Sequence, residues 1–519
     1  VDPEAYATIA GLTVKQAQKA VLEQLVEQGL LIGEPRPIQH PVKFYERGER
    51  PLEIVTSRQW YIRNGGRDPE LREALIARGA EVTWHPTHMQ HRYDNWVEGL
   101  NGDWLISRQR FFGVPIPIWY ALDEHGEPRY DEPLLPNESQ LPIDPSTDVP
   151  AGYTEDQRDQ PGGFVGDADI FDTWATSSLT PEIAGGWEED GDLFEHVFPM
   201  DMRPQAHDII RTWLFSTITR SHHEFGCAPW TNTSLSGWIL DPDRKKMSKS
   251  KGNVVTPMDL FETYGTDAVR YWAGSARPGV DTAFSEDQMK VGRKLANKLL
   301  NVTKFVLQFG APTADHSLDD GVTEAIDRSM LAKLDAVVIE ATEAFEAFDY
   351  ARALERTEAF FWWFCDNYVE LVKGRTYDES RPDAADSSKR ALRTALSTVQ
   401  RLFAPILPFT SEEAWSWWND GSVHLASWPA PIGTEDQPFG DPALADATIE
   451  VLTQVRRAKT EAKRSQRAGV ESLVVAAPGS LHAAIESGRS DLVDAGSIQN
   501  LTIVDGDAVT TTVTLTDDD

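Results

Sequence analysis

The second half of the sequence is dominated by apolar residues that recur every three or four positions. Between residues 331 and 348 these are Leu331, Leu334, Val338, Ala341, Phe345 and Phe348, and the same spacing returns after residues 354 and 392. This period places apolar side chains on one face of an α-helix, and that face must be buried against a partner. We therefore predict a bundle of long helices over residues 325–430, with a capping box at Thr410–Glu413 that opens a further helix.

The rest of the chain has a different sequence pattern, in which short apolar runs are separated by proline and glycine. Such runs are typical of strands and short helices in an α/β fold. The pattern predicts helices over residues 14–28, 69–78 and 446–467, strands over 51–62, 473–477 and 501–504, a long loop or insertion over 131–163, and a linker over 429–442. The chain therefore combines an α/β part, a helical bundle and a small α/β segment at the end.

Lysine is concentrated in one short stretch. No lysine occurs from Phe44 through Arg244, and four then follow within seven positions, at Lys245, Lys246, Lys249 and Lys251. The mostly apolar run Ser234–Leu240 before them predicts a buried strand, and Thr256 followed by Pro257 predicts the cap and first residue of a helix. A solvated basic turn is one interpretation. The other is a flexible strand-to-helix loop whose ammonium groups neutralise a phosphate chain.

The formal net charge of −33 limits the kinds of partner that the surface can attract. An acidic surface repels nucleic acid unless cations are clustered locally or high salt screens the charge. We favour a folded surface adapted to high salt, because the basic residues gather at a few places. The two cysteines are too few for a disulfide framework or a cysteine zinc site, which together with the absence of a membrane-length apolar run favours a cytoplasmic location.

Four blocks of the sequence resemble the class I aminoacyl-tRNA synthetases of the valine, isoleucine and leucine branch. The blocks are Ile106–Gly113, Asp172–Ser178, Arg203–Trp213 and the KMSKS stretch Lys246–Ser250, and the third is most similar to its version in the valine-specific members. The resemblance implies an α/β fold with a partial Rossmann-like class I catalytic core, then an α-helical anticodon-binding bundle and a small C-terminal α/β segment. It also implies ATP-dependent attachment of valine to tRNA(Val) through a valyl-adenylate.

The same resemblance assigns domains and site residues. The expected domains are the end of an inserted editing domain (1–93), the second half of the catalytic core (94–275), a helical connection (276–324), the anticodon-binding bundle (325–430) and the C-terminal α/β domain (443–519). Lys246 and Lys249 are expected to stabilise the departing pyrophosphate. The ATP site would comprise His207, Asp208, Gly237, Trp238, Lys246, Met247, Ser248 and Lys249. The pocket for the valine side chain would be lined by Trp174, Ile209 and Trp213.

Residue patterns alone leave these assignments open. An aspartate such as Asp208 at a helix start is commonly a cap, although at the carboxyl edge of a parallel sheet it can also hold a ribose. The tryptophans can equally be core residues among the seventeen present.

Two sets of cations are candidate tRNA contacts. Arg108 and Arg110 are placed near the acceptor end of tRNA by the resemblance. Clustering of cations in a lysine-poor chain favours a further contact through Lys290, Arg293, Lys294, Arg456, Arg457 and Lys463, with solvated helix faces as the alternative.

Metal ions are expected only with the nucleotide. Mg²⁺ would accompany ATP, and no protein-bound zinc is expected, because residues 121–126 replace the Cys-x-x-Cys knuckle of many relatives. The spacing of His85, His88 and His91 could suggest a metal site, but no further ligand pattern completes it.

No His-x-Gly-His element, which works with the lysine loop in class I enzymes, occurs in the sequence. The family's editing-pocket motifs are also not found. The chain is therefore expected to be a fragment that activates valine poorly by itself and does not proofread, and to be a monomer. The alternatives are an isoleucine-specific synthetase and a non-catalytic tRNA-binding module derived from a synthetase.

Overall fold

The computed structural model describes residues 3–36, 41–44, 51–52, 57–247, 252–312, 321–434 and 437–516. Contacts divide the chain into two units, Val1–Gln59 and Trp60–Asp519. The first unit contains α1 (Pro3–Ala7) and α2 (Val14–Glu27), and α2 confirms the predicted helix. Of the predicted strand over residues 51–62, residues 53–56 lie outside the described part. Pro51 forms an isolated antiparallel bridge with Phe44, and in the second unit β1 (Tyr61–Ile62) pairs with β3 (Trp104–Leu105).

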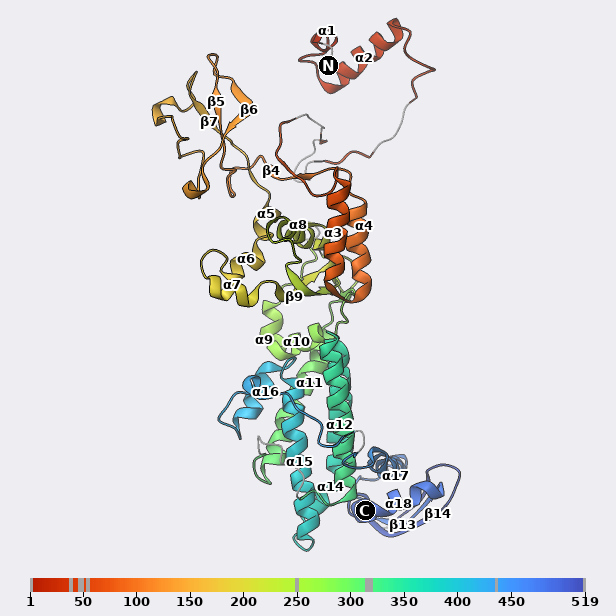
Figure 1. Ribbon diagram of the computed structural model, residues 1–519. Helices are drawn as coiled ribbons and strands as arrows, with labels where there is room; N and C mark the ends of the chain where they lie inside the picture. Colours follow the sequence, from red (N-terminus) through yellow and green to blue (C-terminus); the bar gives the residue numbers. More distant parts are fainter. Residues whose placement is uncertain are drawn as a thin grey trace. The chain divides into compact units, whose positions relative to one another are not determined.

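A three-stranded parallel sheet forms the centre of the α/β part (Figure 1). Its order is β2 (Thr83–His85), β10 (Trp230–Ser236) and β9 (Met200–Ala206). The helices α3 (Pro69–Glu81), α4 (Gln90–Glu98) and α8 (Phe215–Glu224) share one core with it, formed by Leu75, Tyr93, Leu214, Ile218, Trp230 and Leu235 among others. Because the strands are parallel, the segments that follow β9 and β10 emerge at one edge of the sheet.

A smaller antiparallel sheet, of order β6-β5-β7, lies between the two halves of the α/β sequence. It consists of β5 (Trp119–Leu122), β6 (Pro128–Leu134) and β7 (Phe164–Gly166), joined by a long connection with the short 3₁₀ turns η2 (Glu138–Gln140) and η3 (Glu155–Gln157). The predicted insertion over residues 131–163 is therefore largely this connection. After it come β8 (Ile170–Phe171), paired with β4 (Ser107–Arg108), and then α5 (Thr173–Ser177), α6 (Thr180–Gly185) and α7 (Gly191–Val197).

The strand predicted before the lysine loop is interrupted. β10 ends at Ser236, and the separate strand β11 (Ile239–Leu240) pairs with β12 (Thr282–Ala283). Gly237 lies at the break, where a Cβ would lie 2.2 Å from the carbonyl carbon of Val280. The chain can pass this point only where no side chain is present.

The helix predicted after the lysine loop exists, but its start was predicted wrongly. α9 (Met258–Tyr264) has Pro257 as its N-cap, and the Pro257 carbonyl accepts the first helical hydrogen bonds, from the N–H groups of Leu260 and Phe261. Thr256 lies outside the helix and does not cap it. The helix α10 (Thr266–Gly274) then follows after Gly265.

The predicted helical bundle is confirmed, and Figure 1 shows its long helices running alongside one another. It contains α11 (Glu286–Leu307), α12 (Ala325–Glu346), α13 (Tyr350–Trp363), the π-helical turn η7 (Phe364–Tyr368), α14 (Val369–Thr376), α15 (Pro382–Phe403) and α16 (Pro408–Ser416), followed by the 3₁₀ turn η8 (Val423–Leu425). The capping box at Thr410–Glu413 was wrong, since α16 begins at Pro408. The buried carboxylate of Asp267, from α10, accepts hydrogen bonds from the N–H groups of Phe409 and Thr410 and caps this helix instead.

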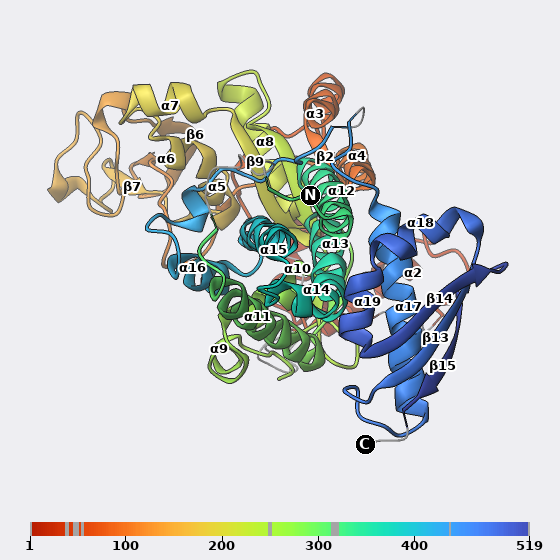
Figure 2. The same cartoon turned by 90° about the horizontal axis from the view of Figure 1, so that it is seen from below.

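The C-terminal segment packs into the same hydrophobic core as the bundle. α17 (Pro442–Glu461) starts earlier than the predicted helix over residues 446–467, because Asp441 caps it, and it also ends earlier. The sheet order is β14 (Ile498–Asp505), β13 (Val470–Ala477), β15 (Thr510–Leu515), and Figure 2 shows α17 and α19 (Arg489–Gly496) against these strands, with α18 (Gly479–Ser487) nearby. A buried network, in which Arg375 of α14 pairs with Asp327 of α12 and Asp491 of α19, joins this segment to the bundle.

None of the described helices is long and apolar enough to cross a membrane.

Candidate functional site

The residues predicted to bind ATP converge where β9 and β10 end. His207 and Asp208 follow β9 in the 3₁₀ turn η4 (His207–Ile209), and Trp238 follows β10. The Lys246 ammonium lies 4.0 Å from the centroid of the Trp238 ring and 3.9 Å from the Asp208 carboxylate. The His207 and Trp238 rings are 4.8 Å apart between centroids. Four predicted residues from three separate segments therefore form one cluster.

His207 is held between two residues that the sequence did not single out. Its Nδ1 lies 3.2 Å from an Arg92 guanidinium nitrogen, and its Nε2 lies 3.4 Å from Asp281 Oδ1. Arginine can only donate hydrogen bonds, so Nδ1 accepts and Nε2 carries the proton toward Asp281. A backbone hydrogen bond from Trp238, with smaller contributions from His207 and Arg92, lowers the pKa of Asp281. The lowered pKa favours the ionised form of Asp281, which accepts the hydrogen bond from His207 Nε2 and so orients the ring.

The base of the lysine loop is tied closed by Asp241. Its carboxylate accepts hydrogen bonds from the Lys245 backbone N–H at 2.7 Å and from the Asn253 side chain at 2.8 Å, and these bonds lower its pKa. Arg244 has a positive φ of 61°, which allows the tight turn that brings Lys246 back to pair with Leu240. Lys246 and Met247 are thus placed by the start of the loop. Ser248 and Lys249, also predicted for this site, lie outside the described residues.

The three residues predicted for the amino-acid pocket lie on adjacent elements. Trp174 lies on α5, Ile209 in η4, and Trp213 in the π-helical turn η5 (Ile210–Leu214), and all three are partly buried. The Trp213 indole N–H donates to the Ser177 carbonyl at the end of α5 at 2.8 Å. Single π-helical turns are frequent at functional sites. The structure therefore links the element that carries Trp174 to the element that carries Trp213.

Of the two arginines predicted to face the acceptor end of tRNA, Arg108 is used within the protein. Its guanidinium pairs with the buried Asp172 at 2.9 Å and donates to the carbonyls of Leu105 and Ser107. Arg110 is exposed, beside Phe111 and Phe112, whose relative exposures are 104% and 92%. Arg108 thus braces the segment, whereas Arg110 is available at its surface.

The two basic helix faces meet at one residue of η7. Lys298 of α11 pairs with the Asp366 carboxylate at 2.8 Å, and Arg456 of α17 donates to the Asp366 carbonyl at 3.2 Å. Lys290, Arg293 and Lys294 are exposed on α11, although Lys290 pairs with Asp287 and Arg293 donates to the Thr263 carbonyl. Arg457 pairs with Glu461, and Lys463 is exposed just after α17. Lys298 of α11 and Arg456 of α17 therefore both contact Asp366.

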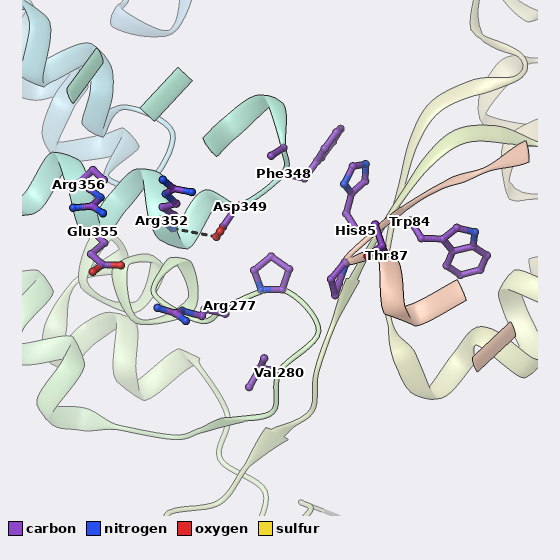
Figure 3. Close-up of a pocket in the computed structure, with 13 residues that line it drawn as sticks. Trp84, His85, Thr87, Arg277, Val280, Phe348, Asp349, Arg352, Glu355 and Arg356 are labelled. Carbon is purple, nitrogen blue, oxygen red and sulfur yellow. Dashed lines mark hydrogen bonds between the residues drawn. The ribbon is translucent and has the colours of Figure 1, made fainter. Parts of the chain in front are cut away.

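A pocket of about 710 Å³ opens beside the nucleotide cluster, between the α/β part and the bundle (Figure 3). Its lining residues include His85 at the end of β2, Thr87 just after it, Arg277 and Val280 after α10, Phe348 and Asp349 between α12 and α13, and Arg352, Glu355 and Arg356 on α13. The His85 and Phe348 rings pack 4.1 Å apart between centroids. In the described part of the chain, no group of three or more His, Cys, Asp or Glu side chains is arranged to hold a metal ion.

One short segment links this pocket to the nucleotide cluster. Arg277 and Val280 line the pocket, and the next residue, Asp281, bonds to His207 and Trp238. Gly279 donates its N–H to the Leu235 carbonyl at 2.7 Å, and a Cβ at Gly279 would lie 2.6 Å from Pro86 Cγ. Sequence patterns gave no signal for Asp281 or Arg92, because both reach His207 only through the tertiary fold.

Comparison with known protein families identifies two matching regions. Residues 3–285 match the model of tRNA synthetases class I (I, L, M and V), and residues 327–474 match the anticodon-binding domain of tRNA ligase. The first match covers more than half of the chain.

Comparison with curated proteins gives high identity to valine–tRNA ligases. The chain is 62% identical over 501 residues to that of Thermobifida fusca (strain YX), covering 96% of this chain and 56% of that protein. It is 58% identical over 520 residues to that of Salinispora tropica, covering 97% and 60%. The chain therefore spans less than two thirds of the length of these relatives.

Solved structures share the fold. The ternary complex of Agrobacterium radiobacter K84 agnB2 LeuRS with tRNA and LeuAMS superposes with a TM-score of 0.51 at 21% identity, over 64% of this chain and 43% of that chain. Mycobacterium tuberculosis methionyl-tRNA synthetase in complex with methionyl-adenylate superposes with a TM-score of 0.50 at 20% identity, over 71% and 64%. Together with the two family matches, this likeness shows that the parallel sheet is part of a Rossmann-like class I synthetase domain, which an anticodon-binding domain follows in the chain.

Proposed function

Because the chain belongs to the class I tRNA synthetases, we propose that it carries part of a valine–tRNA ligase, which attaches valine to tRNA(Val) through a valyl-adenylate at the expense of ATP. The observation that carries this proposal is the cluster of His207, Asp208, Trp238 and Lys246, in a chain that is 62% identical to a valine–tRNA ligase. The domain assignment given above, from the end of an editing domain to a C-terminal α/β domain, belongs to the same proposal. So do a monomeric state and a cytoplasmic location.

The nucleotide cluster suits the formation of an adenylate. Asp208 and His207, at the carboxyl edge of the sheet, are placed to contact the adenosine. The Lys246 ammonium is half exposed and 3.9 Å from Asp208, and an exposed pair of this kind contributes at most about 1 kcal/mol. It can therefore leave Asp208 at small cost when negative charge grows on the departing pyrophosphate, and stabilise that charge. Lys249 would act beside it.

Mg²⁺ is a further part of the proposal, and it would enter bound to the phosphates of ATP. The ion would add positive charge at the phosphates, while Lys246 and the neighbouring backbone N–H groups position them.

The amino-acid pocket would take a small branched side chain. On this proposal Trp174 and Trp213 form two walls, and Ile209 lies between them. Rigid indoles exclude larger side chains by steric contact. They discriminate valine from isosteric threonine by only about a hundredfold, so a separate hydrolytic editing step would be required.

The adjoining basic faces of α11 and α17 would bind the tRNA backbone. Their meeting at Asp366 supports one continuous contact surface in a chain whose net charge is −33. Lys294, Lys463 and Arg110 are exposed and would contribute directly. Binding would weaken steeply with salt, because each neutralised phosphate releases counterions.

Amino-acid-dependent ATP–pyrophosphate exchange tests the proposal. We expect the full-length protein to catalyse exchange with valine, and Lys246→Ala to lower kcat about 100- to 1000-fold, in line with the loss of one group that stabilises developing charge. Arg129→Ala, which removes an exposed cation on β6, is the matched control and should leave kcat unchanged. Exchange that depended on isoleucine instead of valine, or that was unaffected by Lys246→Ala, would contradict the proposal. We expect the 519-residue chain alone to exchange poorly.

A further inference from the structure

Arg203 is an unusual residue to find beneath the proposed amino-acid pocket. It lies in the middle of β9 with a relative exposure of 6%, and its Nε and one terminal nitrogen have no hydrogen-bond partner among the described residues. Burial of the guanidinium lowers the pKa of Arg203 to about 9, so the group remains mostly charged at neutral pH. A buried cation of this kind needs compensation from its surroundings.

Two tryptophan rings and one carboxylate supply that compensation. The Arg203 guanidinium lies over the ring of Trp213 and over that of Trp230, 4.9 Å from the Trp230 centroid. The electron-rich faces of indoles attract a cation, and most strongly where water is excluded. Glu182 is 2% exposed, neither of its oxygens accepts a hydrogen bond from another residue, and its charge favours the charged form of Arg203. The position of Arg203 is therefore set largely by the rings, and its guanidinium lies against the ring of Trp213.

A second arginine holds the helix that carries Trp174. Arg220 of α8 donates from Nε to Ser178 Oγ at 2.9 Å and from a terminal nitrogen to the Ala175 carbonyl at 3.1 Å. These bonds hold α5, the helix of Trp174. The charge of Glu182 also acts on Arg220. The two arginines thus hold the two elements that carry the tryptophans, with one buried carboxylate acting on both.

We propose that Arg203 is a positioning residue that sets the width of the amino-acid pocket by holding the ring of Trp213, and so determines which aliphatic side chains are accepted. This inference rests on the proposed function. On this proposal Arg203 acts through Trp213 and not on the reacting atoms. Its planar guanidinium is what allows contact with ring faces, and a lysine ammonium cannot reproduce that contact.

The test compares Arg203→Lys with a control of equal burial in the full-length protein. Arg401 of α15 is 5% exposed, and desolvation lowers its pKa to about 10, but among the described residues no aromatic ring lies against its guanidinium. We expect Arg203→Lys to raise the KM for valine about tenfold and to change kcat less than about threefold in pyrophosphate exchange. The ratio of kcat/KM for isoleucine to that for valine should rise about tenfold, since one methylene in an apolar pocket discriminates by about 10- to 200-fold. Arg401→Lys should lower the unfolding temperature without changing either quantity.

A second variant keeps the inference testable if Arg203→Lys does not fold. Trp230→Phe reduces the ring behind the guanidinium, and it should raise the KM for valine in the same direction by about threefold. Wild-type KM and wild-type selectivity in the folded variant would overturn the inference. If the wild-type protein activated another amino acid, the proposed function would be refuted instead. The KM of Arg203→Lys for that amino acid, compared with the wild-type KM, would then still decide the role of Arg203.

Discussion

Replacing Arg375 by methionine should destabilise the bundle and the C-terminal segment together. Arg375 is 1% exposed and donates five hydrogen bonds, to both oxygens of Asp327, both oxygens of Asp491 and the Ala384 carbonyl. These bonds join α12, α14 and α19. Methionine fills similar space but leaves two carboxylates buried without their cation.

The expected loss is about 3–5 kcal/mol in the free energy of unfolding, the usual cost of removing one partner from a buried ion pair. The cost should depend on pH. In the wild type, desolvation raises the pKa of Asp491 while Arg375 opposes the rise. Without Arg375 the pKa should rise further, and a raised carboxyl pKa contributes stability that is lost as pH rises above the unfolded value of about 4. The loss in the free energy of unfolding of Arg375→Met should therefore be smaller at pH 5 than at pH 7.

Guanidinium chloride unfolding followed by circular dichroism measures this difference. Arg381→Met is the matched control, since Arg381 also bridges two carboxylates, Asp378 and Asp494, and also reaches α19, but its side chain is 34% exposed. We expect the control to cost about 1 kcal/mol or less. Equal losses for the two variants, or a deficit at Arg375→Met that did not change with pH, would refute the reasoning.

Two further substitutions test the packing around the nucleotide cluster and the bundle. Gly237→Ala would place a Cβ 2.2 Å from the Val280 carbonyl carbon, and it should lower the free energy of unfolding by about 1–3 kcal/mol and raise the KM for ATP. Gly191→Ala, where no atom lies within 4 Å of the new Cβ, should leave both quantities unchanged. An unchanged KM in Gly237→Ala would contradict the role given to that close contact. Asp267→Asn removes a charge that caps α16 through Thr410 N–H at 2.6 Å, and thermal unfolding should show a loss of about 1 kcal/mol. A loss below the error of the measurement would mean that α16 does not depend on this cap.

Local patterns predicted the long elements and failed at their ends. The apolar period identified α12 and α15, because a long apolar helix face must be buried, although Phe348 lies beyond the end of α12 and α15 begins at Pro382, before Leu392. The start of α16 was missed because its cap, Asp267, lies 142 residues before Phe409 in the sequence. The strand β15 was overlooked although its threonine and valine residues are typical of strands.

The candidate site was predicted by resemblance far better than by spacing. The resemblance named Lys246, Asp208 and Trp238, and the fold brings them together. It could not name Arg203 or Asp281, because their roles arise from contacts with tryptophan and histidine side chains that are remote in the sequence. A buried arginine in a strand is the one local signal that could have been read, since arginine is rarely buried without a specific partner.

The segment Arg277–Asp281 gives the two halves of the molecule a common wall. One end lines the pocket against the α12–α13 corner, and the other end bonds to Trp238 beneath the Lys246 ammonium. The segment has only five residues and contacts both the pocket and the nucleotide cluster. An insertion or deletion in it would therefore displace the residues at both places. A chimaera that exchanged the bundle for that of a relative would therefore have to place its junction before Arg277, so that the loop and its bundle travel together.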